Sequence, residues 1–472
     1  MSTLTSGSLR PAALSFTHRY FDLLFFGFSL VFPVCFYLGL TYFFVAQPNP
    51  FDSLIDGVMM VFKLFWYGGI ILVPSSFLAF VLYGSPLGKN QQNLLALEAE
   101  GWNENYLLNV VYVSKGVNVE ALERSVTNSE TLLKQWKISA QVEVVTDLPV
   151  AKNFTAGAKS IKRTFVQVPT SYQTPNGALY KARALQYALT QRKLENVEAK
   201  QVFNLHLDEE SQLTPEVLAG LHEFLKNPQN HSSVGQGEIK YNAYNYGEHK
   251  LITAIDSIRT GDDLGRFRFQ LKLLHRPLFG LHGSFLLIPQ TVEERIGFDL
   301  GGKGSITEDA YFALLAADKG IRFNWVEGFI REQSPFTLRD VLRQRRRWIS
   351  GLEILAADPI MKLSTRLPLR INLVLWEIAW ISILITIVNV IVGGSYYPTW
   401  LSYLAGFLTG GYISLYTVGA YRNLRDLDWS GLRKLYTYLL IFLLVPLAAL
   451  VEAVAVIYAL LYPMKTFEVV KK

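Results

Sequence analysis

Three polar clusters in the middle of the chain have the residue types needed for chemistry on a charged ligand. Asp208-Glu209-Glu210 follow an apolar run, Thr307-Glu308-Asp309 precede a helical pattern, and Gln344-Arg345-Arg346-Arg347-Trp348 come later. Carboxylates at Asp208 and Glu210 are spaced so that both can bind one divalent cation. Hard oxygen ligands favour Mg²⁺ or Mn²⁺, so the first cluster is a candidate metal site. Its alternative interpretation is a solvated helix start, since Thr214-Pro215-Glu216 follows closely.

The second cluster offers a candidate general base. Asp309 follows the glycine-rich stretch 301–304 and begins the helical pattern 310–319. A carboxylate at this position can accept the proton of an attacking hydroxyl group. The alternative is an N-terminal helix cap, because acidic side chains are favoured there by the helix dipole alone.

The third cluster lies on a predicted helix, 337–355, whose apolar residues have helical spacing. One interpretation is an amphipathic helix at a membrane surface. The other gives separate tasks to Arg347, which suits diphosphate oxygens, to Trp348, whose indole suits a sugar ring, and to Gln344 as a hydrogen-bonding group for an acceptor. Both interpretations can hold together.

Alternating strand and helix patterns predict the elements that position these clusters. Strands are expected at 109–113, 142–147, 165–168 and 202–207, and helices at 119–137 and 177–189. In open α/β sheets, ligands bind beyond the carboxyl ends of the strands. Asp147 and Asp208 stand at two such ends, so we expect an α/β fold with the site at that edge.

The composition indicates membrane segments around this domain. Hydrophobic residues make up 50% of the 472, charged residues only 18%, and the mean hydropathy is +0.21, which is too apolar for an ordinary soluble enzyme. Each predicted span is long enough to cross about 30 Å of hydrocarbon. The five windows are 22–46, 57–84, 371–394, 399–421 and 435–462. Pro446 and Glu452 leave open a broken or re-entrant last segment, and with it the side of the membrane on which the tail 465–472 lies.

Charge and cysteine content exclude other classes. The net charge of +6 comes from basic residues near span ends, which favours anionic membrane lipids as partners and not nucleic acid. The single cysteine, Cys35, lies in the first window, so one chain has no disulfide framework. We expect a multi-pass integral membrane protein with its catalytic domain in the cytosol. The expected regions are 1–94 with two spans, the domain 95–335, interface helices 336–369, and 370–472 with about three spanning or re-entrant helices.

The ordered set of Asp147, the three clusters and their spacing resembles the membrane-embedded, inverting family 2 glycosyltransferases. The resemblance covers about 200 residues and implies a GT-A (Rossmann-like) domain inserted between transmembrane helices. The chain is more narrowly similar to egghead-type β-1,4-mannosyltransferases, which move mannose from GDP-mannose to a glucosyl lipid. The segments that carry this similarity are Glu143-Val144-Val145-Thr146-Asp147, 177–187, His206-Leu207-Asp208-Glu209-Glu210 and Ser334-Pro335-Phe336-Thr337-Leu338.

The resemblance implies a role for each site residue. Asp309 would be the general base, and Asp208 and Glu210 would hold Mg²⁺ or Mn²⁺. The nucleotide sugar would be bound by Asp147, Lys181, Arg183, Asp208 and Arg347. The acceptor would be bound by Gly283, Ser284, Glu308, Gln344 and Trp348. Two departures from cellulose-type synthases concern the metal motif, which ends in Glu210 where many have Asp, and the first strand, which ends in Ser114-Lys115-Gly116.

The implied function is an inverting, metal-dependent transfer of a hexose to a glycolipid or glycan acceptor with a β linkage. Mannose from GDP-mannose is the expected donor, and a UDP-sugar is the alternative. A processive polysaccharide synthase that secretes its product would have the same motifs. A transporter with a regulatory domain is a distant alternative, because the spans show no inverted halves and no series of intramembrane charges.

Overall fold

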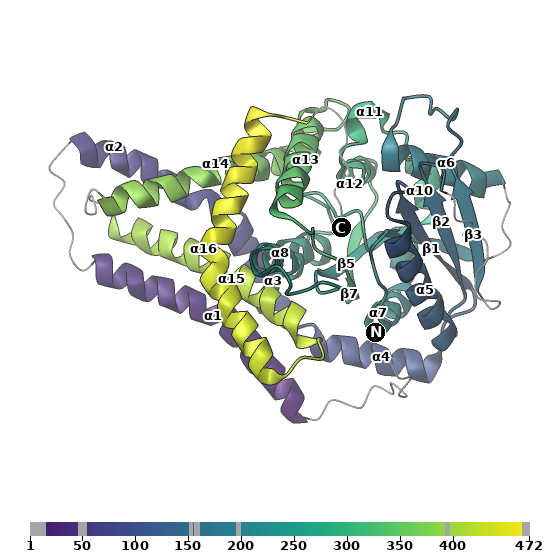
Figure 1. Ribbon diagram of the computed structural model, residues 1–472, viewed down its shortest axis with the longest axis horizontal. Coiled ribbons are helices and arrows are strands. Elements are labelled where there is room, and N and C mark those ends of the chain that lie inside the picture. The colour runs from purple at the N-terminus through teal and green to yellow at the C-terminus, as the bar shows by residue number, and fades with distance from the viewer. Residues whose placement is uncertain are drawn as a thin grey trace.

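The computed structural model describes residues 16–45, 54–150, 154, 161–194, 200–391 and 397–464. A sheet domain forms one end of the molecule, and long helices extend from it at the other end (Figure 1). The strands are β1 (Tyr106–Ser114), β2 (Ala140–Thr146), β3 (Lys162–Gln167), β4 (Gln201–Asp208), β5 (Val234–Lys240), β6 (Leu286–Pro289) and β7 (Phe323–Arg331).

The helices of the sheet domain come before, between and after these strands. They are α4 (Leu87–Glu100), α5 (Val119–Gln135), α6 (Tyr180–Leu194), α7 (Pro215–Lys226), η2 (Pro228–Ser232), α8 (Lys250–Asp262), the π-helical turn η3 (Asp263–Phe267), α9 (Arg268–Lys272), α10 (Gln290–Ile296), α11 (Gly301–Gly304), α12 (Glu308–Asp318) and α13 (Leu338–Ala357). The remaining helices are α1 (Phe16–Val45), α2 (Leu54–Phe62), η1 (Lys63–Gly69), α3 (Leu72–Tyr83), α14 (Leu363–Ile391), α15 (Thr399–Arg425) and α16 (Gly431–Leu461).

The seven strands form one mixed sheet in the order β3-β2-β1-β4-β6-β5-β7. All neighbours are parallel except β6, which runs antiparallel to both β4 and β5. Pairing of Ser114 with Thr146, and of Val113 with Asp208, brings the ends of β1, β2 and β4 to one edge. The prediction of an α/β fold is confirmed, and the predicted edge does carry Asp147 and Asp208.

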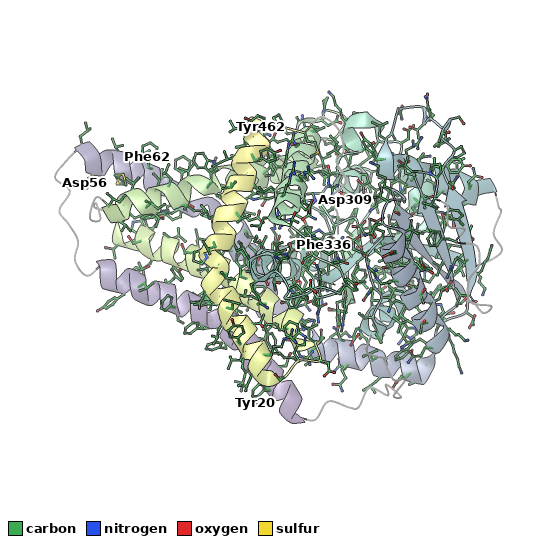
Figure 2. All side chains as sticks on the ribbon, viewed as in Figure 1. Tyr20, Asp56, Phe62, Asp309, Phe336 and Tyr462 are labelled. Atoms are coloured by element: carbon green, nitrogen blue, oxygen red, sulfur yellow. The ribbon has the colours of Figure 1, made fainter. Side chains whose placement is uncertain are left out.

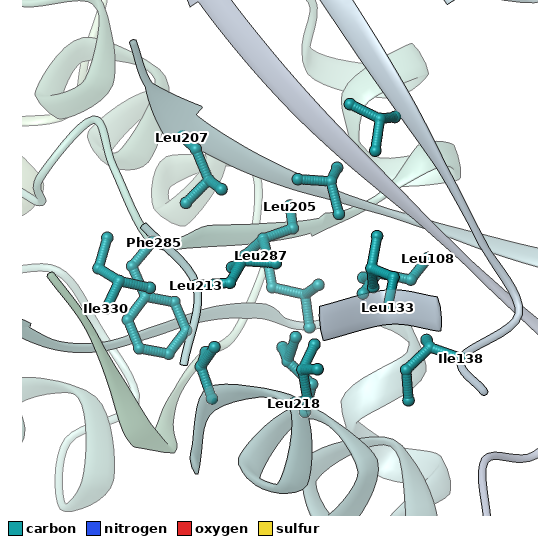
Figure 3. Packing of buried hydrophobic residues seen from close by; sticks show 14 of the residues in the cluster. Leu108, Leu133, Ile138, Leu205, Leu207, Leu213, Leu218, Phe285, Leu287 and Ile330 are labelled. Atoms are coloured by element: carbon teal, nitrogen blue, oxygen red, sulfur yellow. The ribbon is translucent and has the colours of Figure 1, made fainter. Parts of the chain in front are cut away.

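Two hydrophobic clusters cover the two faces of the sheet. Because side chains alternate along a strand, Val110 and Tyr112 of β1 belong to one cluster, and Val111 and Val113 to the other. The first cluster packs the sheet on α5 and α7, and the second packs it on α6 and α12. Figure 3 shows the first cluster, with Leu205 and Leu287 on the strands lying over Leu218 of α7.

The sheet domain is bonded directly to the long helix α15. Arg422 donates two hydrogen bonds to Glu238 of β5, at 2.9 and 2.7 Å, and both side chains are 1% exposed. Asn423 accepts a bond from the backbone N–H of Tyr241 (3.1 Å), and Asp426 pairs with Lys240. The same helix lies against α8, where a Cβ on Gly419 would be 1.7 Å from the Ser257 carbonyl oxygen. Only glycine permits so close an approach of two helices.

Four segments of the described chain are long and apolar enough to cross a membrane: Tyr20–Tyr42, Asp56–Tyr83, Leu363–Ile391 and Gly431–Leu461. They match four of the five predicted windows and are compatible with a membrane protein. The fifth window is helical, as α15, but it is more buried within the protein than the other four. Most of its central and C-terminal residues are buried against α1, α8 and α16, which explains its glycines and hydroxyl side chains.

The last helix, α16, continues through Pro446 without a break from Gly431 to Leu461. Glu452 on this helix is bonded to Arg345 of α13, with 2.7 Å between Oε1 and Nε. The acidic residue that suggested an interrupted span thus pairs with an arginine of the sheet domain. The tail 465–472 lies outside the described residues.

Candidate active site

Three carboxylates converge at the end of β4. One oxygen each from Asp208, Glu210 and Glu332 lie within 4.8 Å of one another. Ligand oxygens on opposite sides of an octahedral Mg²⁺ stand about 4.2 Å apart, so small side-chain adjustments would suffice to hold such an ion. Glu332, which directly follows β7 and is 2% exposed, was not predicted from the sequence. An acidic residue immediately after a strand was the signal that could have found it.

The Asp208 cluster is not a helix start. Thr214 caps α7, accepting a hydrogen bond from the Val217 backbone at 3.3 Å, and the helix begins at Pro215. Within the triplet, Glu209 turns away from the metal group and accepts a hydrogen bond from Ser114. The carboxylates of Asp208 and Glu210 therefore do not serve α7, which favours their interpretation as metal ligands.

Lys181 connects the first two polar clusters. Its Nζ lies 2.6 Å from Asp208 Oδ1 and 3.5 Å from Glu308 Oε1, and it donates to the Gly283 carbonyl oxygen at 3.3 Å. Burial alone would lower the pKa of Lys181, but the charges of Asp208 and Glu308 outweigh burial and raise it above the ordinary value. The ammonium group therefore stays charged and can neutralise phosphate oxygens.

Gly283 and Ser284 lie against Lys181, Asp309 and Asp208. A Cβ on Gly283 would be 2.9 Å from Asp309 Oδ2 and 3.0 Å from Lys181 Nζ, so a larger residue would displace one of them. Ser284 is buried; its hydroxyl accepts from the Asp208 backbone N–H at 3.3 Å and bonds Ser211 at 2.8 Å. Ser284 thus supports Asp208, whereas its predicted contact with the acceptor remains a prediction.

Asp309 is the second residue of α12, and Thr307 occupies the cap position. Asp309 is therefore not the N-cap residue itself, but it lies in the first turn and its Oδ1 accepts from the Ala310 backbone N–H at 2.8 Å, so both interpretations of its carboxylate stay open. In the view of Figure 2, the label of Asp309 lies between the long helices and the sheet, and the residue is partly exposed. For Glu308, burial and the charge of Asp309 raise the pKa to about 7, against the effect of Lys181. A carboxyl that is partly protonated at neutral pH can donate a hydrogen bond to a sugar oxygen.

Asp147 and Arg183 form a separate pair at the end of β2. Arg183 Nη2 lies 2.8 Å from Asp147 Oδ1, and Nη1 donates to the Tyr172 carbonyl oxygen at 3.1 Å. Arg183 stands two residues after Lys181 in the first turn of α6, so one helix start carries both basic residues. Arg183 thus fixes Asp147, and nucleotide contacts of the two remain predictions.

The helix α13 lies directly on the segment that precedes Asp309. A Cβ on Gly351 would be 2.4 Å from Thr307 Cγ2, so the helix and the Thr307 turn touch. Arg347 donates to the Ile306 carbonyl oxygen at 3.3 Å, and its charge acts on Glu308. The structure therefore brings Arg347 to the same group as Lys181, Glu308 and Asp309.

The three consecutive arginines have different surroundings. Arg345 is 2% exposed and bonds Glu452 of α16 at 2.7 Å and Asp256 of α8 at 3.4 Å. Arg346 points to the end of α16, where it donates to the Tyr462 carbonyl oxygen. Only Arg347 lies at the Glu308 group. A helix that merely rested on a membrane surface would not bury one arginine of the three between two other helices.

Gln344 and Trp348 lie beside this buried arginine. Gln344 is 1% exposed, and its side-chain oxygen accepts a hydrogen bond from Arg345 Nη1 at 2.7 Å. The guanidinium carbons of Arg345 and Arg259 lie 4.5 and 4.9 Å from the Trp348 ring centroid. These contacts fix the indole in place. Binding of the acceptor by Gln344 and Trp348 stays a prediction.

Conservative Arg→Lys replacements at the three positions should have three different outcomes. Arg347→Lys should lower kcat/KM with little change in melting temperature, because lysine lacks the planar fork that matches a diphosphate. Arg345→Lys should mainly lower stability, because lysine keeps the charge but cannot make the separate guanidinium hydrogen bonds to Glu452, Gln344 and Asp256. Arg346→Lys should resemble the wild type. Kinetics and thermal unfolding of the three purified variants test this, and equal behaviour of all three would contradict it.

Comparison with known proteins identifies the family of the chain. Residues 205–470, over half of the chain, match the family described as glycosyl transferase family group 2. Beta-1,4-mannosyltransferase egh of Drosophila melanogaster is 33% identical over 351 residues, 73% of each chain. Beta-1,4-mannosyltransferase bre-3 of Caenorhabditis elegans is 36% identical over 250 residues, 53% of each chain.

Two solved structures show weaker similarity. Mannosyltransferase PcManGT from Pyrobaculum calidifontis, in complex with GDP-Man and Mn²⁺, is 14% identical, with a TM-score of 0.39 over 77% of this chain and 100% of that one. S. aureus TarS is 13% identical, with a TM-score of 0.34 over 58% and 43% of the two chains.

The chain belongs to glycosyl transferase family group 2. Its sheet domain has the GT-A fold, and several apolar helices flank it. Within this family it is a hexosyltransferase whose curated relatives are β-1,4-mannosyltransferases.

Proposed function

We propose that this enzyme transfers mannose from GDP-mannose to a lipid-linked or glycan acceptor, with inversion and with a divalent cation, Mg²⁺ or Mn²⁺. The observation that carries the proposal is the convergence of Asp208, Glu210 and Glu332 beside the group of Lys181, Glu308 and Asp309. The names of the relatives, all β-1,4-mannosyltransferases, support mannose as the sugar.

The proposed reaction is one in-line displacement. The acceptor hydroxyl attacks the anomeric carbon on the face opposite the diphosphate, and its proton passes to a carboxylate oxygen of Asp309. The bond from the anomeric carbon to the diphosphate oxygen breaks, and its electron pair leaves with GDP. An α-linked donor then gives a β-linked product.

Each charged group has a defined task in this proposal. Lys181 and Arg347 bind the diphosphate through charge-assisted hydrogen bonds. A cation held by Asp208, Glu210 and Glu332 would neutralise the charge that grows on the leaving diphosphate. Asp147, fixed by Arg183, lies at the strand end where the nucleoside is expected.

We also propose a multi-pass integral membrane protein with the sheet domain in the cytosol. Basic residues near the domain-side ends of α14 and α15, among them Arg366, Arg370 and Arg425, support this orientation under the positive-inside rule. The helix α13, which carries Arg347 and Trp348, packs on α14 and α16, and a site beside membrane helices suits a lipid-linked acceptor.

A donor screen tests the proposed function. Detergent-solubilised protein would receive GDP-mannose, GDP-fucose, UDP-glucose or UDP-N-acetylglucosamine with membrane lipid extract, and release of GDP or UDP and labelled lipid would be measured. GDP-mannose should give acceptor-dependent release and a single added hexose. A product series that lengthens with time would indicate a polymerase instead.

A further inference from the structure

A stripe of charged residues on α8 connects the Trp348 contact to the loop that holds Gly283. Asp256, Arg259 and Asp263 follow one another at i, i+3 and i+7, so they lie on one face of the helix and its π-helical continuation. Asp256 bonds Arg345 at 3.4 Å, and Arg259 lies over the Trp348 ring. This face of α8 therefore borders the place where the acceptor is expected.

The third member of the stripe holds a histidine. Asp263 Oδ1 lies 2.7 Å from His282 Nε2, and Asp263 Oδ2 accepts from the Ile239 backbone N–H at 2.9 Å. The imidazole stacks on Phe267, with 4.5 Å between ring centroids and 24° between planes. Asp263 is 1% exposed, so both the carboxylate and the ring plane are fixed.

The backbone of His282 is fixed as well. Gln236 donates to the His282 carbonyl oxygen at 2.8 Å and accepts from its N–H at 3.4 Å. The next residue is Gly283, at which a Cβ would be 2.9 Å from Asp309 Oδ2. His282 is therefore the sequence neighbour of a residue that lies against the candidate base.

The other nitrogen of this ring, Nδ1, is not used by Asp263. Nδ1 makes no hydrogen bond to any residue in the described part of the chain, and the side chain is 21% exposed. Since Nε2 is taken by Asp263, Nδ1 is the polar atom that a ligand can reach. A hydroxyl group can both donate and accept, so it can bond Nδ1 of a neutral or a protonated imidazole.

From this placement we infer that His282, oriented by Asp263, binds a hydroxyl of the acceptor sugar through Nδ1 and so aligns the attacking hydroxyl with Asp309. This inference rests on the proposed hexosyl transfer. His282 acts as an acceptor-binding residue, and Asp263 and Phe267 act as positioning residues. The family resemblance assigned acceptor roles to Gly283 and Ser284 but none to His282 or Asp263.

His282→Phe is the most informative variant, because phenylalanine keeps a ring on Phe267 and removes both nitrogens. With octyl β-glucoside as acceptor and GDP-mannose as donor, we expect kcat/KM for the acceptor to fall by about 10- to 100-fold, as expected for a lost hydrogen bond to a substrate hydroxyl. The KM for GDP-mannose and acceptor-free GDP release should change by less than about twofold. His282→Gln should recover part of the loss.

Asp263→Asn tests whether Asp263 acts on the acceptor through His282. Alone it should weaken acceptor use in the same direction, and in the His282→Phe background it should add less than about twofold, because the two act through one contact. His249→Phe, an exposed histidine just before the same helix, is the matched control and should behave as wild type.

These experiments distinguish failure of the proposed mannosyl transfer from failure of the proposed role of His282. Failure of the wild-type enzyme to transfer mannose to any acceptor would overturn the proposed function. Transfer by the wild type and equal transfer by His282→Phe would overturn only the role of His282. A parallel loss of donor binding, acceptor use and melting temperature would likewise overturn it, since that pattern belongs to a purely structural residue.

Discussion

Replacing Asp309 by asparagine is expected to lower turnover by about 10²- to 10⁴-fold while GDP binding persists, because an amide cannot take the proton of the attacking hydroxyl. Asp309 stands on α12 beside Gly283, and the residues proposed to bind the diphosphate, Lys181 and Arg347, come from α6 and α13. Turnover with GDP-mannose and calorimetric binding of GDP, measured on the same preparation, would check both halves of this expectation.

Asp318→Asn, at the far end of the same helix, is the control for Asp309→Asn. It removes the charge of a carboxylate whose Oδ1 accepts a hydrogen bond from Thr365 Oγ1 at 2.8 Å. This carboxylate lies at the other end of α12 from Glu308. The kcat of Asp318→Asn should stay near that of the wild type. Normal turnover by a folded Asp309→Asn enzyme would exclude Asp309 as the base and direct attention to Glu308.

Removal of the metal should lower turnover to an extent comparable with Asp309→Asn. Chelation with EDTA should stop transfer and Mn²⁺ or Mg²⁺ should restore it, whereas Asp208→Ala, Glu210→Ala and Glu332→Ala should each lose this rescue. Electrostatic stabilisation by a metal contributes several kcal/mol, so activity should fall by roughly 100-fold or more. Titration of Mn²⁺ followed by electron paramagnetic resonance measures the loss of binding separately from activity.

Glu209, which lies between Asp208 and Glu210 in the sequence, provides the control for the metal ligands. Glu209 bonds Ser114 and does not belong to the metal group, so Glu209→Gln should retain Mn²⁺ binding and most of the activity. Full activity of the wild type in excess EDTA, or undiminished Mn²⁺ binding by Glu332→Ala, would remove the three carboxylates from this role.

The sequence was informative wherever a strand or helix pattern ended in a charged residue. The apolar run before Asp208 and the helical pattern after Asp309 each placed a carboxylate at a defined end, and β4 and α12 have those ends. Parallel pairing then brings Asp147 and Asp208 to one edge without further information. The α/β fold class could also be predicted from such local patterns, because strand and helix patterns alternate along the chain.

Residues that depend on long-range contacts could not be predicted in this way. Glu332 approaches Glu210 because Gln212 bridges to Arg331 and β7 pairs with β5, and neither contact has a local pattern. The bond between Asp263 and His282 depends on the π-helical turn after α8. The window 399–421 is expected to span the membrane, and its helix α15 is mostly buried against α1, α8 and α16; apolar content alone does not reveal such helix–helix contacts.

The bonds between β5 and α15 have a consequence for the acceptor. Because Glu238 is bonded to Arg422 and Gly419 lies against Ser257, the sheet domain and α15 are joined by contacts that resist movement of one against the other. In the proposed reaction with a lipid-linked acceptor, a fixed distance between Asp309 and the membrane would select acceptors by how far their terminal hydroxyl stands from the bilayer. A product lengthened by one sugar would no longer match that distance, which would favour release after a single transfer.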